Sequence, residues 1–71
     1  MHEEVNRMQT FAEKLKAARK AAGMTQKGMA ALMLIPFRTI QDWEGEKHTP
    51  PEYVQRFVLN ELESLRKESK A

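Results

Sequence analysis

The chain of 71 residues contains no cysteine, which excludes disulfide bonds and metal sites built on thiolates. Its only histidines are His2 and His48, and neither stands near a cluster of other metal-binding residues. A nucleophile beside a base and a glycine-rich phosphate loop are missing as well. We therefore expect no enzyme activity, no metal, no cofactor and no small-molecule substrate.

Long apolar runs are missing too. The longest, Met29–Ile35, has seven residues, whereas a membrane-spanning helix needs about 20. The first residues, MHEE, are acidic, whereas a signal peptide begins with a basic segment. We expect no membrane association and a location in the cytoplasm, whose reducing conditions suit a chain without cysteine.

The formal net charge is only +2, but it is unevenly distributed. Residues 10–50 contain seven Lys or Arg against four Asp or Glu, and the remainder from residue 51 contains four against four. The positive excess therefore lies in the middle of the chain. A basic region of this kind favours an anionic partner such as nucleic acid.

A chain of this length forms at most one domain. Its first helix is predicted to start at a capping box, Thr10 to Glu13, and to end at Gly23 in a left-handed conformation. Residues 1–9 are assigned to an N-terminal arm, although their apolar spacing also allows a backward extension of this helix. We place the domain at residues 10–67 and a charged tail at 68–71. Helical spacing gives the first helix an apolar face, which consists of Phe11, Leu15, Ala18 and Ala22. The lysines at 14, 16 and 20 lie on another face, which we interpret as solvated.

Two short amphipathic segments follow and are joined at Leu34-Ile35-Pro36. Thr25 is a good N-cap for the first segment. Pro36 cannot continue that helix but fits the first position of a second one, residues 36–44. Ile40 and Trp43 form the apolar back of this second helix. Two helices on a tight connection, the second with a polar front, are typical of a helix-turn-helix.

The last helix is predicted to begin at Pro51 and to run to about Lys67. Its apolar residues fall on one broad stripe, which consists of Val54, Phe57, Val58, Leu62 and Leu65. This helix is longer than a small four-helix core requires. Leu59, Leu62 and Leu65, with Leu32 contributing, are therefore candidates for a dimer interface.

The segment from Phe11 to Phe57 resembles the lambda-repressor/Cro-like (XRE-type) helix-turn-helix family. Its matching features are the TQ at residues 25–26, the small Ala30, the Glu after Trp43 and the apolar slots at Met29, Met33, Ile35, Ile40 and Trp43. The resemblance implies an all-α, compact four-helix lambda-repressor-like DNA-binding domain, here with a long last helix. Two departures affect glycine: Leu34 stands in the turn where the family usually has Gly, and Gly45 comes one residue early.

The resemblance also implies roles for individual residues. Those implied to face the bases are Phe37, Arg38, Gln41 and Asp42. Those implied to face the phosphates are Thr25, Gln26, Lys27, Thr39, Lys47 and His48. Arg19 and Glu44 occupy the positions of a structural ion pair. Asp42 stands four residues after Arg38, so it either contacts a base or holds the guanidinium.

We therefore expect a sequence-specific double-stranded-DNA-binding, repressor-like transcriptional regulator, bacterial or phage-encoded, that binds a palindromic operator as a homodimer. The alternative is a protein-interaction module of the same fold, an antitoxin or a phage adaptor, whose main partner is a protein. A third possibility is an architectural DNA binder without sequence preference.

Overall fold

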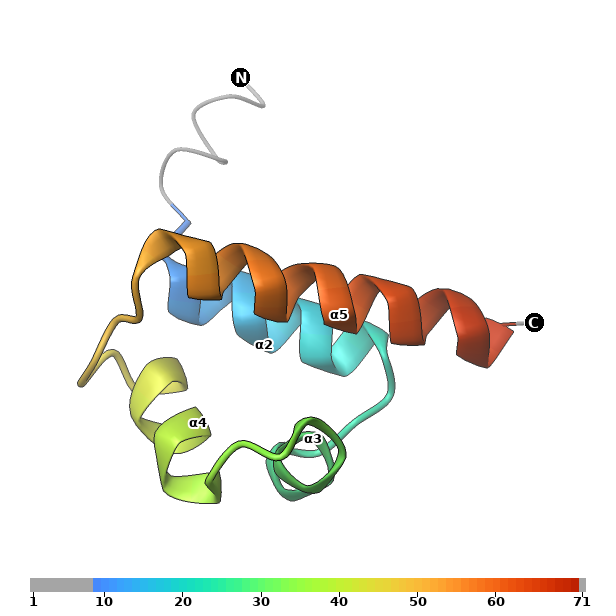
Figure 1. The fold of residues 1–71 in the computed structure, drawn as a ribbon, viewed down its shortest axis with the longest axis horizontal. Coiled ribbons are helices and arrows are strands. Elements are labelled where there is room, and N and C mark those ends of the chain that lie inside the picture. Colours follow the sequence, from blue (N-terminus) through green and yellow to red (C-terminus); the bar gives the residue numbers. More distant parts are fainter. Residues whose placement is uncertain (1–8, 71) are drawn as a thin grey trace.

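A computed structural model describes the backbone of residues 9–70 and the side chains of residues 9–67. This part of the chain is all-α and contains four helices: α2 (Phe11–Ala21), α3 (Gln26–Met33), α4 (Phe37–Glu44) and α5 (Glu52–Lys70). α2 and α5 lie alongside each other, and α3 and α4 lie next to each other below this pair (Figure 1). None of the helices in residues 9–70 has the length and apolar character needed to cross a membrane.

The starts of α2 and α3 are determined by local hydrogen bonds. The Thr10 side chain accepts a hydrogen bond from the backbone N–H of Glu13, whose carboxylate in turn accepts one from the N–H of Thr10. Thr25 Oγ1 accepts a hydrogen bond of 2.9 Å from the N–H of Gly28. Both caps satisfy donors that the first helical turn leaves unpaired. The predicted capping box and the predicted Thr25 cap are confirmed, as is the left-handed Gly23, with φ +75°.

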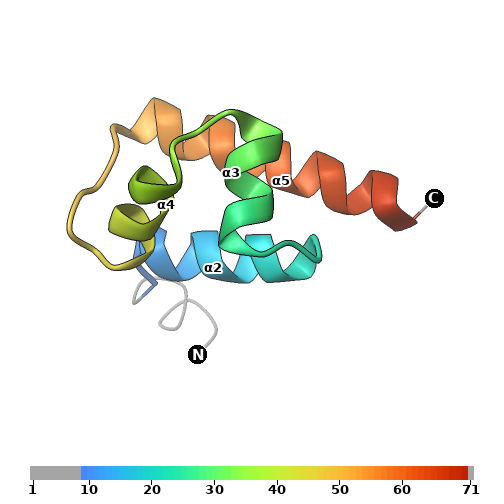
Figure 2. The same ribbon diagram turned by 90° about the horizontal axis from the view of Figure 1, so that it is seen from below.

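Some predicted boundaries need correction. α4 begins at Phe37, because Pro36 has φ −55° and ψ 137° and is the N-cap residue rather than the first helical one. α5 begins at Glu52 and continues to Lys70, so residues 68–70 extend the helix instead of forming a separate tail. The expected arm at residues 1–9 lies, apart from residue 9, outside the described residues. The C-terminal turns of α5 project beyond the other three helices (Figure 2).

The core lies between the four helices. Its buried apolar side chains are Phe11, Ala12, Leu15, Met29, Ala30, Ile40, Val58 and Leu62. Trp43 packs against this cluster, and its ring meets that of Phe11 edge to face at a centroid distance of 5.9 Å. The prediction that Trp43 is a packing residue is confirmed.

Two predictions for α5 are wrong. Phe57 was expected on the buried stripe, but 63% of its surface is exposed. Leu62 was expected at a dimer interface, but it is fully buried in the chain's own core. The reason is helical rotation: successive residues differ by about 100°, so burial of Val58 turns Phe57 towards solvent. Residues 54, 58 and 62, spaced by four, make a narrow stripe.

Within residues 9–70, two residues other than glycine have a left-handed backbone. Leu34 ends α3 with φ 58° and ψ 41°, and Glu46 follows α4 with φ 63°. The two departures from the family pattern, a residue other than glycine in the turn after α3 and in the loop after α4, thus have the same structural outcome. The chain keeps the left-handed turn after each helix and places a residue with a Cβ in it, at a cost of about 1–2 kcal/mol each.

Replacing Leu34 by glycine is expected to stabilise the domain. The side chain is 89% exposed, so its loss removes little packing, while the strain at positive φ disappears. Part of this gain is offset by the greater freedom of glycine in the unfolded chain, leaving about 0.5–1 kcal/mol, or a few degrees in the thermal midpoint. The matched control is Ala31→Gly inside α3, which should destabilise by about 1 kcal/mol. A thermal midpoint of Leu34→Gly below that of the wild type would contradict the inference that Leu34 is strained.

Candidate nucleic-acid interface

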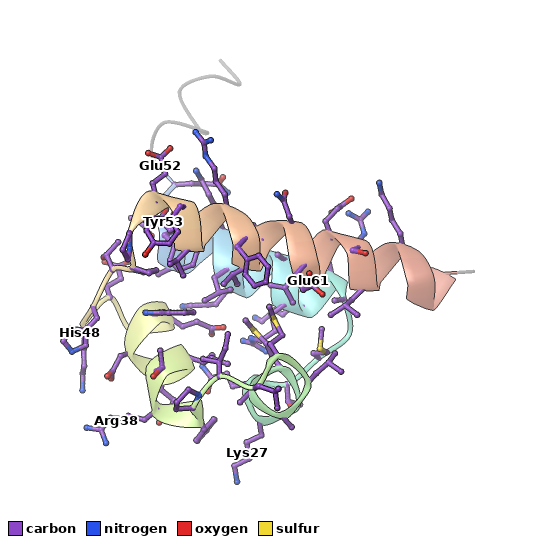
Figure 3. All side chains as sticks on the ribbon, viewed as in Figure 1. Lys27, Arg38, His48, Glu52, Tyr53 and Glu61 are labelled. Atoms are coloured by element: carbon purple, nitrogen blue, oxygen red, sulfur yellow. The ribbon has the colours of Figure 1, made fainter. Side chains whose placement is uncertain are left out.

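The outer face of α4 is defined by what the helix buries. Ile40 is fully buried and Trp43 packs on the core. Arg38 and Gln41 are exposed, and Phe37 and Asp42 are partly exposed. In Figure 3, Arg38 and Lys27 point away from the body on the side opposite α5. Arg38, Gln41 and Asp42 therefore belong to the outer part of α4, whereas Phe37 is partly buried and packs against the core.

Asp42 contacts two basic side chains on this face. Its Oδ1 lies 3.5 Å from Nε of Arg38, and its Oδ2 lies 3.9 Å from Nε2 of His48. The Asp42 carbonyl oxygen also accepts hydrogen bonds from the backbone N–H groups of Lys47 (2.9 Å) and His48 (3.4 Å). The loop after α4 is thereby held against the last turns of the helix, which places His48 beside the outer face of α4.

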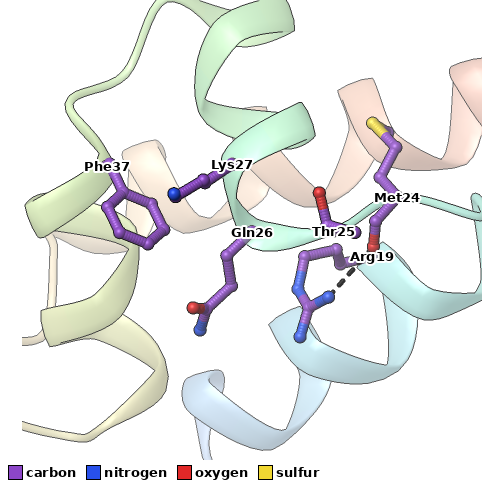
Figure 4. Close-up of a pocket in the computed structure, with 6 residues that line it drawn as sticks. All are labelled: Arg19, Met24, Thr25, Gln26, Lys27 and Phe37. Atoms are coloured by element: carbon purple, nitrogen blue, oxygen red, sulfur yellow. Dashed lines mark hydrogen bonds between the residues drawn. The ribbon is translucent and has the colours of Figure 1, made fainter.

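The start of α3 faces α4 across an open cavity of about 490 Å³ (Figure 4). Gln26, Lys27 and Phe37 are among the residues that line it. The Lys27 ammonium lies 5.6 Å from the centre of the Phe37 ring, a cation–π distance. Phe37 is thus partly engaged within the motif. Of the remaining residues predicted to face phosphates, Thr39 is partly buried and Lys47 is exposed.

A second open cavity, of about 400 Å³, lies beside Gln41. Its lining includes Lys16 and Lys20 from α2, which we interpreted as solvated residues of no particular role. Their spacing of four places them on the same face of α2, but the sequence contained no signal that this face borders α4. The structure therefore adds two ammonium groups to the surroundings of α4.

Arg19, Glu44 and Gln26 form a partly buried network beneath the interface. Arg19 Nε donates to Glu44 Oε2 at 2.7 Å and its terminal nitrogen to Oε1 at 3.0 Å, a bidentate pair. Gln26 Nε2 donates to Glu44 Oε1 at 3.0 Å, and Arg19 also donates to the carbonyl of Met24. The network connects α2, α3 and α4, so it fixes the angle between the two helices of the motif.

Glu44 is almost fully buried in this network, with 4% of its side chain exposed. Burial by itself raises the pKa of the carboxyl group. The hydrogen bonds from Arg19 and Gln26 and the charges of Arg19 and Lys16 outweigh burial, so the pKa of Glu44 lies below its ordinary value. Gln26 has a structural role here in addition to the phosphate contact expected of it.

Residues 15–56, or 42 of the 71 residues, match a family model described as helix-turn-helix. The matched segment contains α3, α4, the turn between them and the Arg19–Glu44 pair. The chain belongs to the lambda-repressor-like (XRE-type) helix-turn-helix family. This is a family of DNA-binding transcription regulators. No curated protein and no solved structure matches the chain significantly.

Among the described residues of this helix-turn-helix protein, no group of three or more His, Cys, Asp and Glu side chains is placed to hold a metal ion. The chemistry that its exposed face offers is hydrogen bonding and positive charge. Arg38 and Gln41 provide the first kind of group, and the lysines around the two cavities provide the second.

Proposed function

We propose that this helix-turn-helix protein binds double-stranded DNA sequence-specifically as a repressor-like transcription regulator, with α4 in the major groove. The observation that carries the proposal is the division of α4 into a buried back and an exposed front. Ile40 is fully buried, whereas the Arg38 side chain is 79% exposed. The major groove accommodates one α-helix, and residues near its N-terminus then reach the base edges.

The two polar readers differ in the base that each suits. A guanidinium donates two hydrogen bonds to O6 and N7 of guanine, and a carboxamide both donates to and accepts from adenine N6 and N7. We assign these roles to Arg38 and Gln41. To Phe37, whose ring lies near the Lys27 ammonium, we assign a contact with a thymine methyl group.

Phosphate contacts are proposed around α4. Lys27 and the backbone at the start of α3 border one cavity, where the helix dipole favours an anion. Lys16 and Lys20 line the adjoining cavity next to Gln41. Lys47 and His48 follow α4 directly in the exposed loop. These groups fix the register of the helix on the duplex and carry no direct sequence information.

Substituting either reader tests this assignment. After selection of a preferred site from a randomised DNA pool, Arg38→Ala or Gln41→Ala should weaken binding to that site about ten- to a hundredfold. Each substitution should also flatten the preference at one base position. The measurement is affinity for the selected and a scrambled site across a salt series.

Lys27→Ala is the control for the same experiment. Loss of a phosphate contact should weaken both DNAs alike and reduce the salt slope by about one unit. If Arg38→Ala and Gln41→Ala leave the ratio of the two affinities unchanged, α4 is not the reading helix.

We also propose that the protein binds a palindromic operator as a homodimer, through a surface that keeps Leu32 and Leu65 of the predicted set and includes Phe57 in place of the buried Leu62. A groove of about 240 Å³ between α3 and α5 is lined by Leu32, Met33, Phe57, Glu61 and Leu65. Leu32 is 56% exposed and Phe57 63%. Leu65 and Leu59 are only partly exposed. In a symmetric dimer the exposed Phe57 of each chain could pack into the α3–α5 groove of the other, so one patch supplies both sides of the contact.

The same exposed patch also supports an alternative function, a protein-interaction module whose main partner is another protein. Tyr53, at the start of α5, is 76% exposed and lies one helical turn before Phe57. Binding to random genomic DNA fragments at low salt separates the two functions. A regulator binds them weakly and with steep salt dependence, whereas a pure protein-interaction module shows no binding.

A further inference from the structure

The outer face of α4 carries one acid among its proposed DNA-contacting groups, and that acid is the least exposed member of its cluster. Asp42 is 18% exposed, against 79% for Arg38 and 73% for His48. A carboxylate on a surface that meets phosphates weakens DNA binding by charge repulsion. Its presence on this face therefore calls for a role other than a phosphate contact. Its position between the guanidinium of Arg38 and the imidazole of His48 indicates what it does.

The Arg38–Asp42 contact leaves the terminal nitrogens of the arginine available. Asp42 Oδ1 approaches Arg38 through Nε, at 3.5 Å. The bidentate contact with guanine can use the two terminal nitrogens on the far side of the guanidinium group. A carboxylate at Nε therefore orients the planar fork without competing for the atoms that read the base.

Asp42 also holds the loop that brings in His48. Its carbonyl accepts the backbone N–H groups of Lys47 and His48, and its second carboxylate oxygen lies 3.9 Å from the imidazole. One residue thus contacts both a group assigned to the bases and a group assigned to the phosphates. Helix geometry explains the first contact, since residues four apart are neighbours on a helix.

We propose that Asp42 is a positioning residue that sets the sequence preference of α4, and not itself a base reader. This inference rests on the proposed DNA-binding function. Asp42 orients the guanidinium group of Arg38 in the DNA-free protein. Its negative charge weakens binding to DNA sites that lack a guanine in position to pair with this oriented group. Both effects increase the ratio of specific to non-specific affinity.

The test is Asp42→Asn, which keeps the size of the side chain and removes its charge. Affinity for the scrambled site should rise several-fold, while the ratio of selected to scrambled affinity should fall about tenfold, with the loss at the base position that Arg38→Ala flattens. In the Arg38→Ala background, Asp42→Asn should no longer change that ratio. A structural defect alone would not produce this dependence on Arg38.

Glu46→Gln is the matched control. It removes the same charge from the loop after α4, but Glu46 contacts the Thr10 hydroxyl at 3.3 Å and no group of the α4 outer face. It should raise affinity for both DNAs by a similar factor and leave their ratio unchanged. If Asp42→Asn behaves as Glu46→Gln does, Asp42 contributes only general charge and the inference is overturned.

The arginine variant separates failure of this inference from failure of the proposed function. If Arg38→Ala lowers the affinity ratio and Asp42→Asn does not, α4 reads DNA without the help of Asp42. If neither substitution, nor Gln41→Ala, changes the ratio, the reading role of α4 fails and this inference fails with it. The nuclear magnetic resonance signal of Arg38 Nε–H in the DNA-free protein gives a second readout. It should shift on Asp42→Asn and stay in place on Glu46→Gln.

Discussion

Arg19→Ala is expected to destabilise the domain by about 3–5 kcal/mol, because it leaves the Glu44 carboxylate buried without its cation. Two hydrogen bonds of 2.7 and 3.0 Å are lost, and Gln26 alone remains as a side-chain donor. Domains of this size are stable by only about 5–10 kcal/mol. The variant should therefore unfold at a midpoint more than about 12 °C below that of the wild type.

Lys20→Ala is the control on the same helix. Lys20 is exposed and next to Arg19 in the chain, so its removal should change stability by no more than about 0.5 kcal/mol. Thermal unfolding of both variants, followed by circular dichroism, makes the comparison. Small effects of similar size would show that the network contributes little to stability.

Acid should weaken the same network. Burial opposes the charged form of Glu44, but the Arg19 and Gln26 hydrogen bonds prevail and hold its pKa below the ordinary value. A group whose pKa is lowered on folding stabilises the protein fully above its unfolded-state pKa, which for glutamate is about 4.3. That stability is lost as the pH falls from there through the lowered pKa. Glu44→Gln removes this titration and should show a shallower loss of stability over the same interval.

Leu62→Ala and Phe57→Glu are expected to separate the core of the monomer from its association surface. Leu62 is fully buried in the core between the four helices, and truncating such a leucine costs about 2–5 kcal/mol. Phe57 is 63% exposed at the α3–α5 groove, so a charge there should leave the helices intact. Leu62→Ala should therefore lower the thermal midpoint strongly, while Phe57→Glu keeps the helical content of the folded chain.

Sedimentation completes the comparison. The wild type at micromolar concentration should have about twice the mass of the 8.2 kDa chain, because a C₂ dimer is the commonest closed assembly. Phe57→Glu should return it to one chain mass. A dimer that persists in Phe57→Glu would place the interface elsewhere, and a wild type that stays monomeric on DNA would reject the homodimer.

The features that the sequence determined by itself are local ones. The caps at Thr10 and Thr25 and the left-handed Gly23 depend on atoms within three or four residues of each other. Helix boundaries and the helix-turn-helix spacing follow from the same short range, because a helix is built from contacts between residues three and four apart. These local features also identify the family and place Arg38 and Gln41 opposite Ile40.

What the tertiary structure alone decided is which part of each broad apolar or charged face meets another helix. α5 presents five apolar residues on one stripe, and only the rotation at which it packs against the other helices buries Leu62 and leaves Phe57 in solvent. The placement of α2 beside α4 brings Lys16 and Lys20 next to Gln41. Periodicity specifies a face but not its neighbour, since contacts between helices such as Arg19–Glu44 join residues that are 25 positions apart. Their relative placement follows from packing of the whole core.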